Sequence, residues 1–228
     1  AMAFVVLLCA VPHLLDRKLL KYIALVGLAS TLHISALMFL PMYYLLDRRW
    51  LSSRLWQAAI LLLAYFAAEM LAEHLFVYVP LALSGLGYDS YAVIQEDLFL
   101  DREVQGLTPG LLFLLASDLI VVMAAPSLKA RYAPWGFQAY YNAYYVGALL
   151  VPVIFFANYI TFARLAFYFI SFKFIVLSFL AHSLFNRPNQ SRWAMGLGVL
   201  LVFSYFGWFS LAIFKGAALC APFQFVFQ

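Results

Sequence analysis

The chain consists of long apolar runs that charged residues rarely interrupt, and this feature limits what it can fold into. Of its 228 residues, 67% are hydrophobic and only 11% are charged. A soluble domain carries about 25% charged residues, so a water-facing surface cannot be assembled from this composition. The composition therefore excludes a soluble enzyme, a disordered chain and a nucleic-acid-binding protein.

The apolar runs are continuous, whereas a transmembrane β-barrel would show short alternating segments. Because a membrane-crossing helix needs about 20 apolar residues, we predict an all-α polytopic transmembrane helix bundle of about six or seven segments. We treat 1–228 as a single integral membrane domain. The expected segments are 2–15, 22–46, 55–79, 109–125, 137–160, 162–185 and 193–214.

The connections between these segments differ in charge. Cytoplasmic loops of membrane proteins carry an excess of Lys and Arg, so the basic connections 47–54, 127–134 and 186–192 should be cytoplasmic. The connection 81–108 is mainly acidic and should be external, and its length is typical of functional loops. The pattern predicts a multi-pass membrane protein.

The segment 22–46 does not fit this alternation, because basic residues flank both of its ends, at 17, 18 and 21 and at 48, 49 and 54. Either the segment is re-entrant and turns back near His33, or one end breaks the charge rule. Of the two we favour a single tilted span.

Ionisable residues inside a span are candidates for function because each costs about 2.5–3.5 kcal/mol on insertion scales. His33 either bonds to a neighbouring helix or serves as a proton acceptor or phosphate ligand, since histidine changes charge near neutral pH. Arg164 is either an interfacial anchor or a cation that binds a diphosphate, which its planar guanidinium suits.

Two further pairs of charges lie in the spans. Glu69 and Glu73 are one helical turn apart and either perform acid–base chemistry or belong to a hydrogen-bond network between helices. Asp118 and Lys173 are opposite in sign and near the middle of their spans. We expect them to neutralise each other, with a proton or ion pathway as the alternative.

Tyrosines and cysteines complete the candidates. Tyr88 and Tyr91, in the external connection, either offer aromatic faces suited to sugar rings or are ordinary tyrosines of an acidic loop. The tyrosines at 140, 141, 144 and 145 are expected to form an aromatic belt at the membrane interface. Cys9 and Cys220 are expected to be small buried apolar residues, with neither a disulfide nor a metal site.

Several stretches resemble the EpsG-type branch of the Wzy-like polysaccharide polymerases. The sequence Leu-His-Ile-Ser-Ala-Leu at 32–37 is followed by Leu-Pro at 40–41, and Tyr88 and Tyr91 open an external loop after a span. Ala-Arg-Leu-Ala-Phe-Tyr-Phe occupies 163–169, and Pro-Phe-Gln at 222–224 is similar to the family's closing stretch. Members of the family are longer, so the resemblance covers their C-terminal portion and predicts that further spans precede position 1.

The resemblance implies polymerisation of lipid-linked oligosaccharide repeat units at the outer face of the bacterial cytoplasmic (inner) membrane. The substrate would be a polyprenyl-diphosphate-linked oligosaccharide, and the partners would be membrane lipids and other polysaccharide-assembly proteins. His33 with Ser35 matches the family's His-Ser motif, and Arg164 with Tyr168 matches its Arg-aromatic motif.

In this interpretation Arg164 stabilises the leaving diphosphate, and His33 is the first candidate for the base, ahead of Glu69 and Glu73. The substrate-binding candidates are Tyr88, Tyr91, Ser35 and Tyr168. Neither a metal nor a cofactor is expected, because arginine can do the electrostatic work. The alternatives are a transporter or flippase for a lipid-linked or anionic solute, and a non-catalytic subunit of an envelope biosynthesis complex.

Overall fold

The computed structural model describes 2–46, 53–68, 108–157, 168–186 and 196–200, with positions 70, 71, 74, 78, 203–205 and 207. Within these ranges all regular structure is helical, which confirms the all-α prediction. The chain divides into two compact units, Ala1–Leu177 and Ser178–Gln228. The first unit contains most of the described helices.

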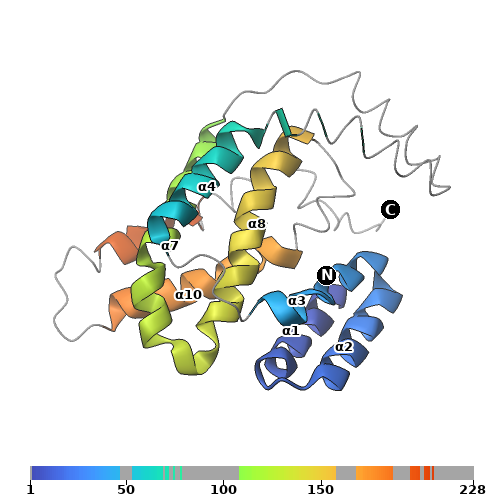
Figure 1. Cartoon of the computed structure of the whole chain (residues 1–228). Helices are drawn as coiled ribbons and strands as arrows, with labels where there is room; N and C mark the ends of the chain where they lie inside the picture. Colours follow the sequence, from blue (N-terminus) through green and yellow to red (C-terminus); the bar gives the residue numbers. More distant parts are fainter. Residues whose placement is uncertain are drawn as a thin grey trace, which may run out of the picture. The chain divides into compact units, whose positions relative to one another are not determined.

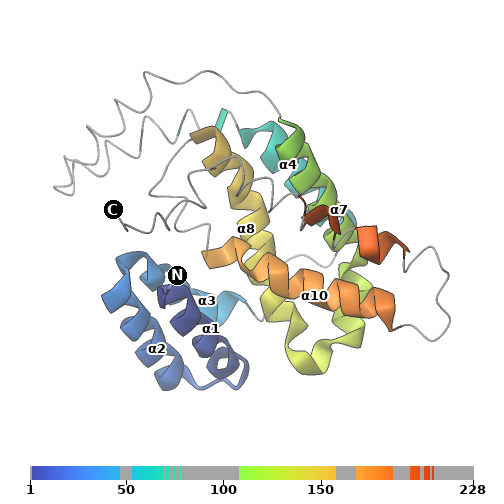
Figure 2. The ribbon, with the colours of Figure 1, turned by 180° about the vertical axis from the view of Figure 1, so that it is seen from behind.

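The helices follow one another with short connections where the chain is described. They are α1 (Met2–Leu15), α2 (Leu19–Leu32), the 3-10 helix η1 (Ile34–Phe39), α3 (Met42–Leu45), α4 (Arg54–Phe66), α7 (Pro109–Arg131), the 3-10 helix η2 (Ala133–Trp135), α8 (Phe137–Ala157) and α10 (Phe172–Phe185). Helices α4, α7 and α8 pack against one another, as Figures 1 and 2 show.

The α7 helix begins where the sequence predicts and ends later. The Thr108 side chain accepts a hydrogen bond from the Leu111 amide at 3.3 Å, and proline occupies the first helical position, a common N-terminal arrangement. The expected connection 127–134 is shorter than predicted, because Lys129 and Arg131 lie in the last turn of α7. Cations there interact favourably with the helix dipole.

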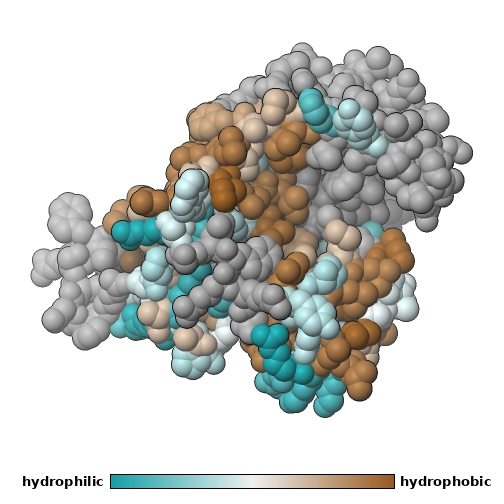
Figure 3. Space-filling view, viewed as in Figure 1, coloured by the Kyte–Doolittle hydropathy of each residue, from teal (hydrophilic) through white to brown (hydrophobic). Residues whose placement is uncertain are grey.

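The α1 and α2 helices form a hairpin around a tight polar turn. Arg17 in this turn has a left-handed backbone (φ 59°). The Lys18 ammonium donates a 2.7 Å hydrogen bond to the Asp16 carboxylate. This bond and the Lys18 charge lower the pKa of the Asp16 carboxyl. Figure 3 shows hydrophilic side chains gathered over this turn.

Residues 22–46, for which we favoured a single tilted span, do not form one continuous helix. The α2 helix ends at Leu32, and His33 takes an extended conformation (φ −159°, ψ 119°). The chain then runs back along α2, because Tyr22 in its first turn donates a hydrogen bond to the Phe39 carbonyl and its ring lies 5.3 Å from that of Tyr43. The segment is therefore a helical hairpin with His33 at its tip.

Much of the described surface is apolar. Leu20, Leu63 and Ile120 are exposed on α2, α4 and α7, and Figure 3 shows apolar residues over large parts of the visible face. Among the described residues, two helical stretches are long and apolar enough to cross a membrane, Pro109–Arg131 and Tyr168–Phe185, which includes α10. Cys9 is a free thiol on the exposed side of α1, so the prediction that it is buried is wrong. On an apolar surface, a cysteine side chain packs against lipid as well as it packs in a protein core.

Candidate functional site

A buried ion pair joins α7 to α10. The Lys173 ammonium lies 2.6 Å from Asp118 Oδ1, and both side chains are almost completely buried. The prediction that these two charges neutralise each other is confirmed. Because an unpaired charge in an apolar interior is costly, this contact fixes α10 to α7.

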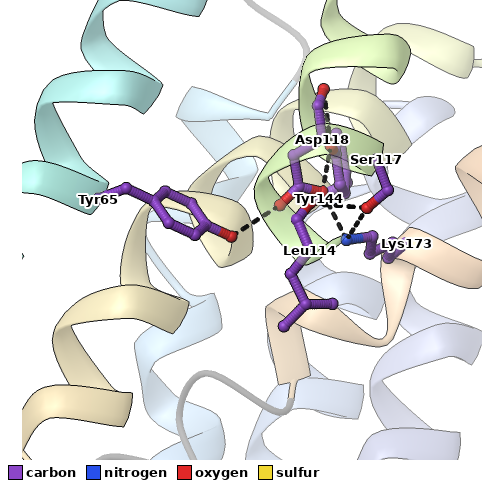
Figure 4. Close-up of polar contacts among 6 residues, drawn as sticks. All are labelled: Tyr65, Leu114, Ser117, Asp118, Tyr144 and Lys173. Carbon is purple, nitrogen blue, oxygen red and sulfur yellow. Dashed lines mark hydrogen bonds and ion pairs between the residues drawn. The ribbon is translucent and has the colours of Figure 1, made fainter. Parts of the chain in front are cut away.

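Hydroxyl groups from two further helices donate hydrogen bonds to the carboxylate of this pair (Figure 4). Tyr144 of α8 donates to Asp118 Oδ1 at 2.7 Å, and Tyr65 of α4 donates to Oδ2 at 3.2 Å. The Lys173 ammonium also donates to Ser117 Oγ at 3.0 Å. The network of Tyr65, Ser117, Asp118, Tyr144 and Lys173 thus joins four helices, and we call it the charged network.

A second polar contact lies nearer the start of α8. The Gln57 side chain, buried on α4, accepts a hydrogen bond from the Tyr141 hydroxyl, and its backbone carbonyl accepts one from Tyr145 at 2.8 Å. The Lys129 ammonium lies 4.2 Å from the centre of the Tyr141 ring. The predicted aromatic belt is therefore wrong for Tyr141, Tyr144 and Tyr145, which are buried between helices.

Two stretches that are far apart in sequence meet in a group of aromatic rings, which we call the aromatic cluster (Phe4, Phe39, Tyr168, Phe169 and Phe172). Phe39, at the end of η1, stacks on Phe169 with ring centres 4.9 Å apart and planes 15° apart. Tyr168 meets Phe39 edge-on at 6.2 Å, while Phe4 and Phe172 border the same rings. The stretch that contains His33 is therefore packed against the described end of the stretch that contains Arg164.

The predicted site residues fall into two groups. His33 is half-buried at the tip of the hairpin, Ser35 lies in η1 and Tyr168 is buried in the aromatic cluster. Predicted positions outside the described residues are Arg164, Glu69, Glu73, Tyr88, Tyr91 and Cys220. The structure thus unites Tyr168 with the hairpin that carries His33 and Ser35.

Sequence reasoning missed Gln57, Tyr65 and Ser117. Gln57 carried a usable signal, because an amide in an apolar helix needs a partner. Tyr65 and Ser117 carried none, since tyrosine and serine are common in membrane helices and their partners come from other helices. Within the described ranges, no group of three His, Cys, Asp or Glu side chains is arranged to hold a metal ion.

Comparison with known proteins gives one family. The model of the EpsG family matches residues 1–225, nearly the whole chain. No curated protein and no solved structure matches. The match indicates a role in polysaccharide biosynthesis and, with the apolar helices, a membrane protein. The chain belongs to the EpsG family, as its motifs predicted.

Proposed function

We propose that this protein polymerises lipid-linked oligosaccharide repeat units at the outer face of the bacterial cytoplasmic membrane. The donor is the growing chain on its polyprenyl diphosphate, and the acceptor is a hydroxyl of the next lipid-linked repeat. The protein acts as a metal-independent glycosyltransferase with several membrane spans. Its partners are membrane lipids and other proteins of polysaccharide assembly.

One observation supports this proposal above the others, namely the stacking of Phe39 on Phe169. The reaction needs a cation for the leaving diphosphate and a base for the acceptor hydroxyl. His33 precedes Phe39 in the hairpin, and Arg164 lies shortly before Phe169 in sequence. The contact between these stretches favours a site to which both contribute.

The proposed reaction exchanges one C–O bond for another. The acceptor oxygen bonds to the anomeric carbon of the donor sugar, and the bond from that carbon to the diphosphate oxygen breaks. The electron pair leaves with the polyprenyl diphosphate, whose growing charge the Arg164 guanidinium stabilises. The hydroxyl proton passes to the base, for which His33 is the first candidate and Glu69 and Glu73 are the others.

Substrate binding is assigned to aromatic and hydroxyl groups. Tyr88 and Tyr91 hold sugar rings from the external connection. Ser35 and Tyr168, which share sequence motifs with His33 and Arg164 respectively, also contribute to substrate binding. Tyr168 packs in the aromatic cluster. Aromatic rings contact the apolar faces of sugars, while a hydroxyl can donate to a sugar or phosphate oxygen.

The test compares Arg164→Ala and Arg164→Lys in a polymerisation assay in cells or with purified protein. We expect Ala to abolish polymer and Lys to restore part of it, because lysine keeps the charge and loses the planar guanidinium. Removing one preorganised charge typically costs about 100- to 1,000-fold in rate. Arg54→Ala, which removes an exposed arginine at the start of α4, is the matched control and should keep full yield. Full chain length and yield in both Arg164 variants would refute the assignment.

A further inference from the structure

We propose that residues 19–46 form a re-entrant hairpin. It enters the bilayer from the side on which the basic connections lie, and it returns to that same side. His33 at its tip then lines a water-containing cavity within the membrane. The cavity admits the polar head group of a lipid-linked substrate, its diphosphate or the first sugar. This inference rests on the membrane location in the proposed function and adds the route by which His33 reaches a substrate.

The α2 helix is too short to cross the hydrocarbon core. The α2 helix has 14 residues, so it is about 21 Å long, whereas the hydrocarbon core is about 30 Å thick. The chain leaves the helical path at His33 rather than continuing outward. The six residues of η1 and the four of α3 then provide a return path of similar length.

After the tip, the chain returns toward the start of α2. Tyr22 lies in the first turn of α2, and its contacts are with Phe39 and Tyr43, which come after the tip. A chain that crossed the membrane once would carry these residues away from Tyr22. Instead, the end of the segment lies beside its beginning.

Both ends of the hairpin lie at one end of α8. Gly136, just before α8, lies so close to α1 that an added Cβ would be 2.5 Å from Leu15 Cδ1. Asn142, in the second turn of α8, donates a hydrogen bond to the carbonyl of Leu46. Leu15 precedes the hairpin and Leu46 closes it, so the chain enters and leaves at the same side.

Charge supports the same arrangement. The α1–α2 turn, the connection after Leu46 and the last turn of α7 are all basic in sequence, and the chain at the start of α8 lies beside Leu15, Leu46 and Lys129. A re-entrant segment keeps these positive groups on one side of the membrane, which satisfies the positive-inside rule. The basic residues are Arg17, Lys18, Lys21, Arg48, Arg49, Arg54, Lys129 and Arg131.

The tip itself indicates a cavity. Non-helical backbone at membrane depth is tolerated only where it is buried in protein or lines water. Ser30 and Thr31 donate their hydroxyls to carbonyls of the preceding turn, but Ile34 is 71% exposed and His33 is only half-buried. An ionisable side chain at membrane depth faces the protein interior or a water-filled cavity, so we infer that water reaches the part of His33 that the described chain leaves exposed.

The experiment measures thiol labelling in membrane vesicles. In a Cys9→Ser, Cys220→Ser background, single cysteines replace Arg17, Ser52 and His33, and Ile120→Cys on α7 serves as the lipid-facing control. A membrane-impermeant maleimide is added to right-side-out and inside-out vesicles. We expect Arg17→Cys and Ser52→Cys to react in inside-out vesicles only. We expect His33→Cys to react with a small charged thiosulfonate at least about tenfold faster than Ile120→Cys.

Two results would overturn the inference. Labelling of positions 17 and 52 from opposite sides would establish a single span, and a His33→Cys thiol as inert as Ile120→Cys would rule out the cavity. If the His33→Cys protein is not inserted into the membrane, labelling is measured on Ser35→Cys in its place. Labelling does not depend on polymer synthesis, so an active Arg164→Ala protein with the expected labelling would refute the proposed reaction and leave the hairpin intact.

Discussion

The Asp118–Lys173 pair shows how a single residue change can be costly in an apolar interior. Lys173→Met leaves the Asp118 carboxylate buried with two tyrosine hydroxyls and without its cation. We expect the free energy of unfolding to fall by about 3–5 kcal/mol. Reversible unfolding of the purified protein in mild detergent measures this change.

The matched variant for this prediction removes both charges. Asp118→Asn with Lys173→Met keeps a side-chain oxygen that accepts from Tyr144, so the double variant should regain most of the lost stability. A double variant that is as unstable as the sum of its two single variants would contradict this account of the network.

The Gln57 contact gives a second residue-scale prediction. Tyr141→Phe keeps the ring near Lys129 and removes the hydroxyl that donates to the buried Gln57 side chain. We expect a loss of about 1–3 kcal/mol in the free energy of unfolding, because a buried polar group loses a partner. Tyr44→Phe, at an exposed position on α3, is the control and should change stability little. Equal losses in the two variants would show that Gln57 does not depend on Tyr141.

At the scale of elements, α8 meets the segment before α10 at very close range. A Cβ added to Gly147 would lie 2.7 Å from the backbone nitrogen of Ile170 and 2.8 Å from the carbonyl carbon of Phe169. Since backbone cannot move aside as a side chain can, Gly147→Ala should cost at least about 1–3 kcal/mol in unfolding free energy. It should also disturb the aromatic cluster that contains Phe169.

Gly27→Ala is the control for the Gly147 prediction. Gly27 lies in α2 with nothing within 4 Å of an added Cβ, so alanine should stabilise that helix by about 0.5–1 kcal/mol. Both changes add one methyl group to a helix. Opposite signs of the change in unfolding free energy would therefore assign the Gly147→Ala loss to packing. A stabilising Gly147→Ala would mean that α8 and Ile170 are not in close contact.

The start of α7 supplies a further element-scale prediction. Thr108→Ala removes the oxygen that accepts from the Leu111 amide and should lower the free energy of unfolding by about 1 kcal/mol. Thr108→Ser keeps a hydroxyl at the same place and should retain stability in the same unfolding experiment. A serine variant as unstable as the alanine variant would assign the effect to the threonine methyl group.

At the scale of the whole molecule, charge and the re-entrant hairpin predict one topology. Reporter domains fused after Leu46 and after Arg131 should be active in the cytoplasm, and one inserted at Gly87 should be active outside. Enzyme reporters that work on only one side of the membrane measure this directly. An external reporter at Leu46 would contradict both the hairpin and the assignment of the basic side.

Sequence alone predicted an all-α membrane protein from its low charge and continuous apolar runs, and the described helices confirm the all-α part. It also located most helices, the family and the pairing of Asp118 with Lys173. These properties depend on composition, local pattern and the sign of two charges.

Only the tertiary structure decided the turn at His33, the burial of the tyrosines in α8 and the meeting of Phe39 with Phe169. Hydropathy reports how apolar a segment is, not whether it crosses or returns. Likewise, a tyrosine has the same sequence signature at a lipid interface and between helices. Which of these occurs depends on contacts between residues far apart in the chain, and the free energy of those contacts is set by packing.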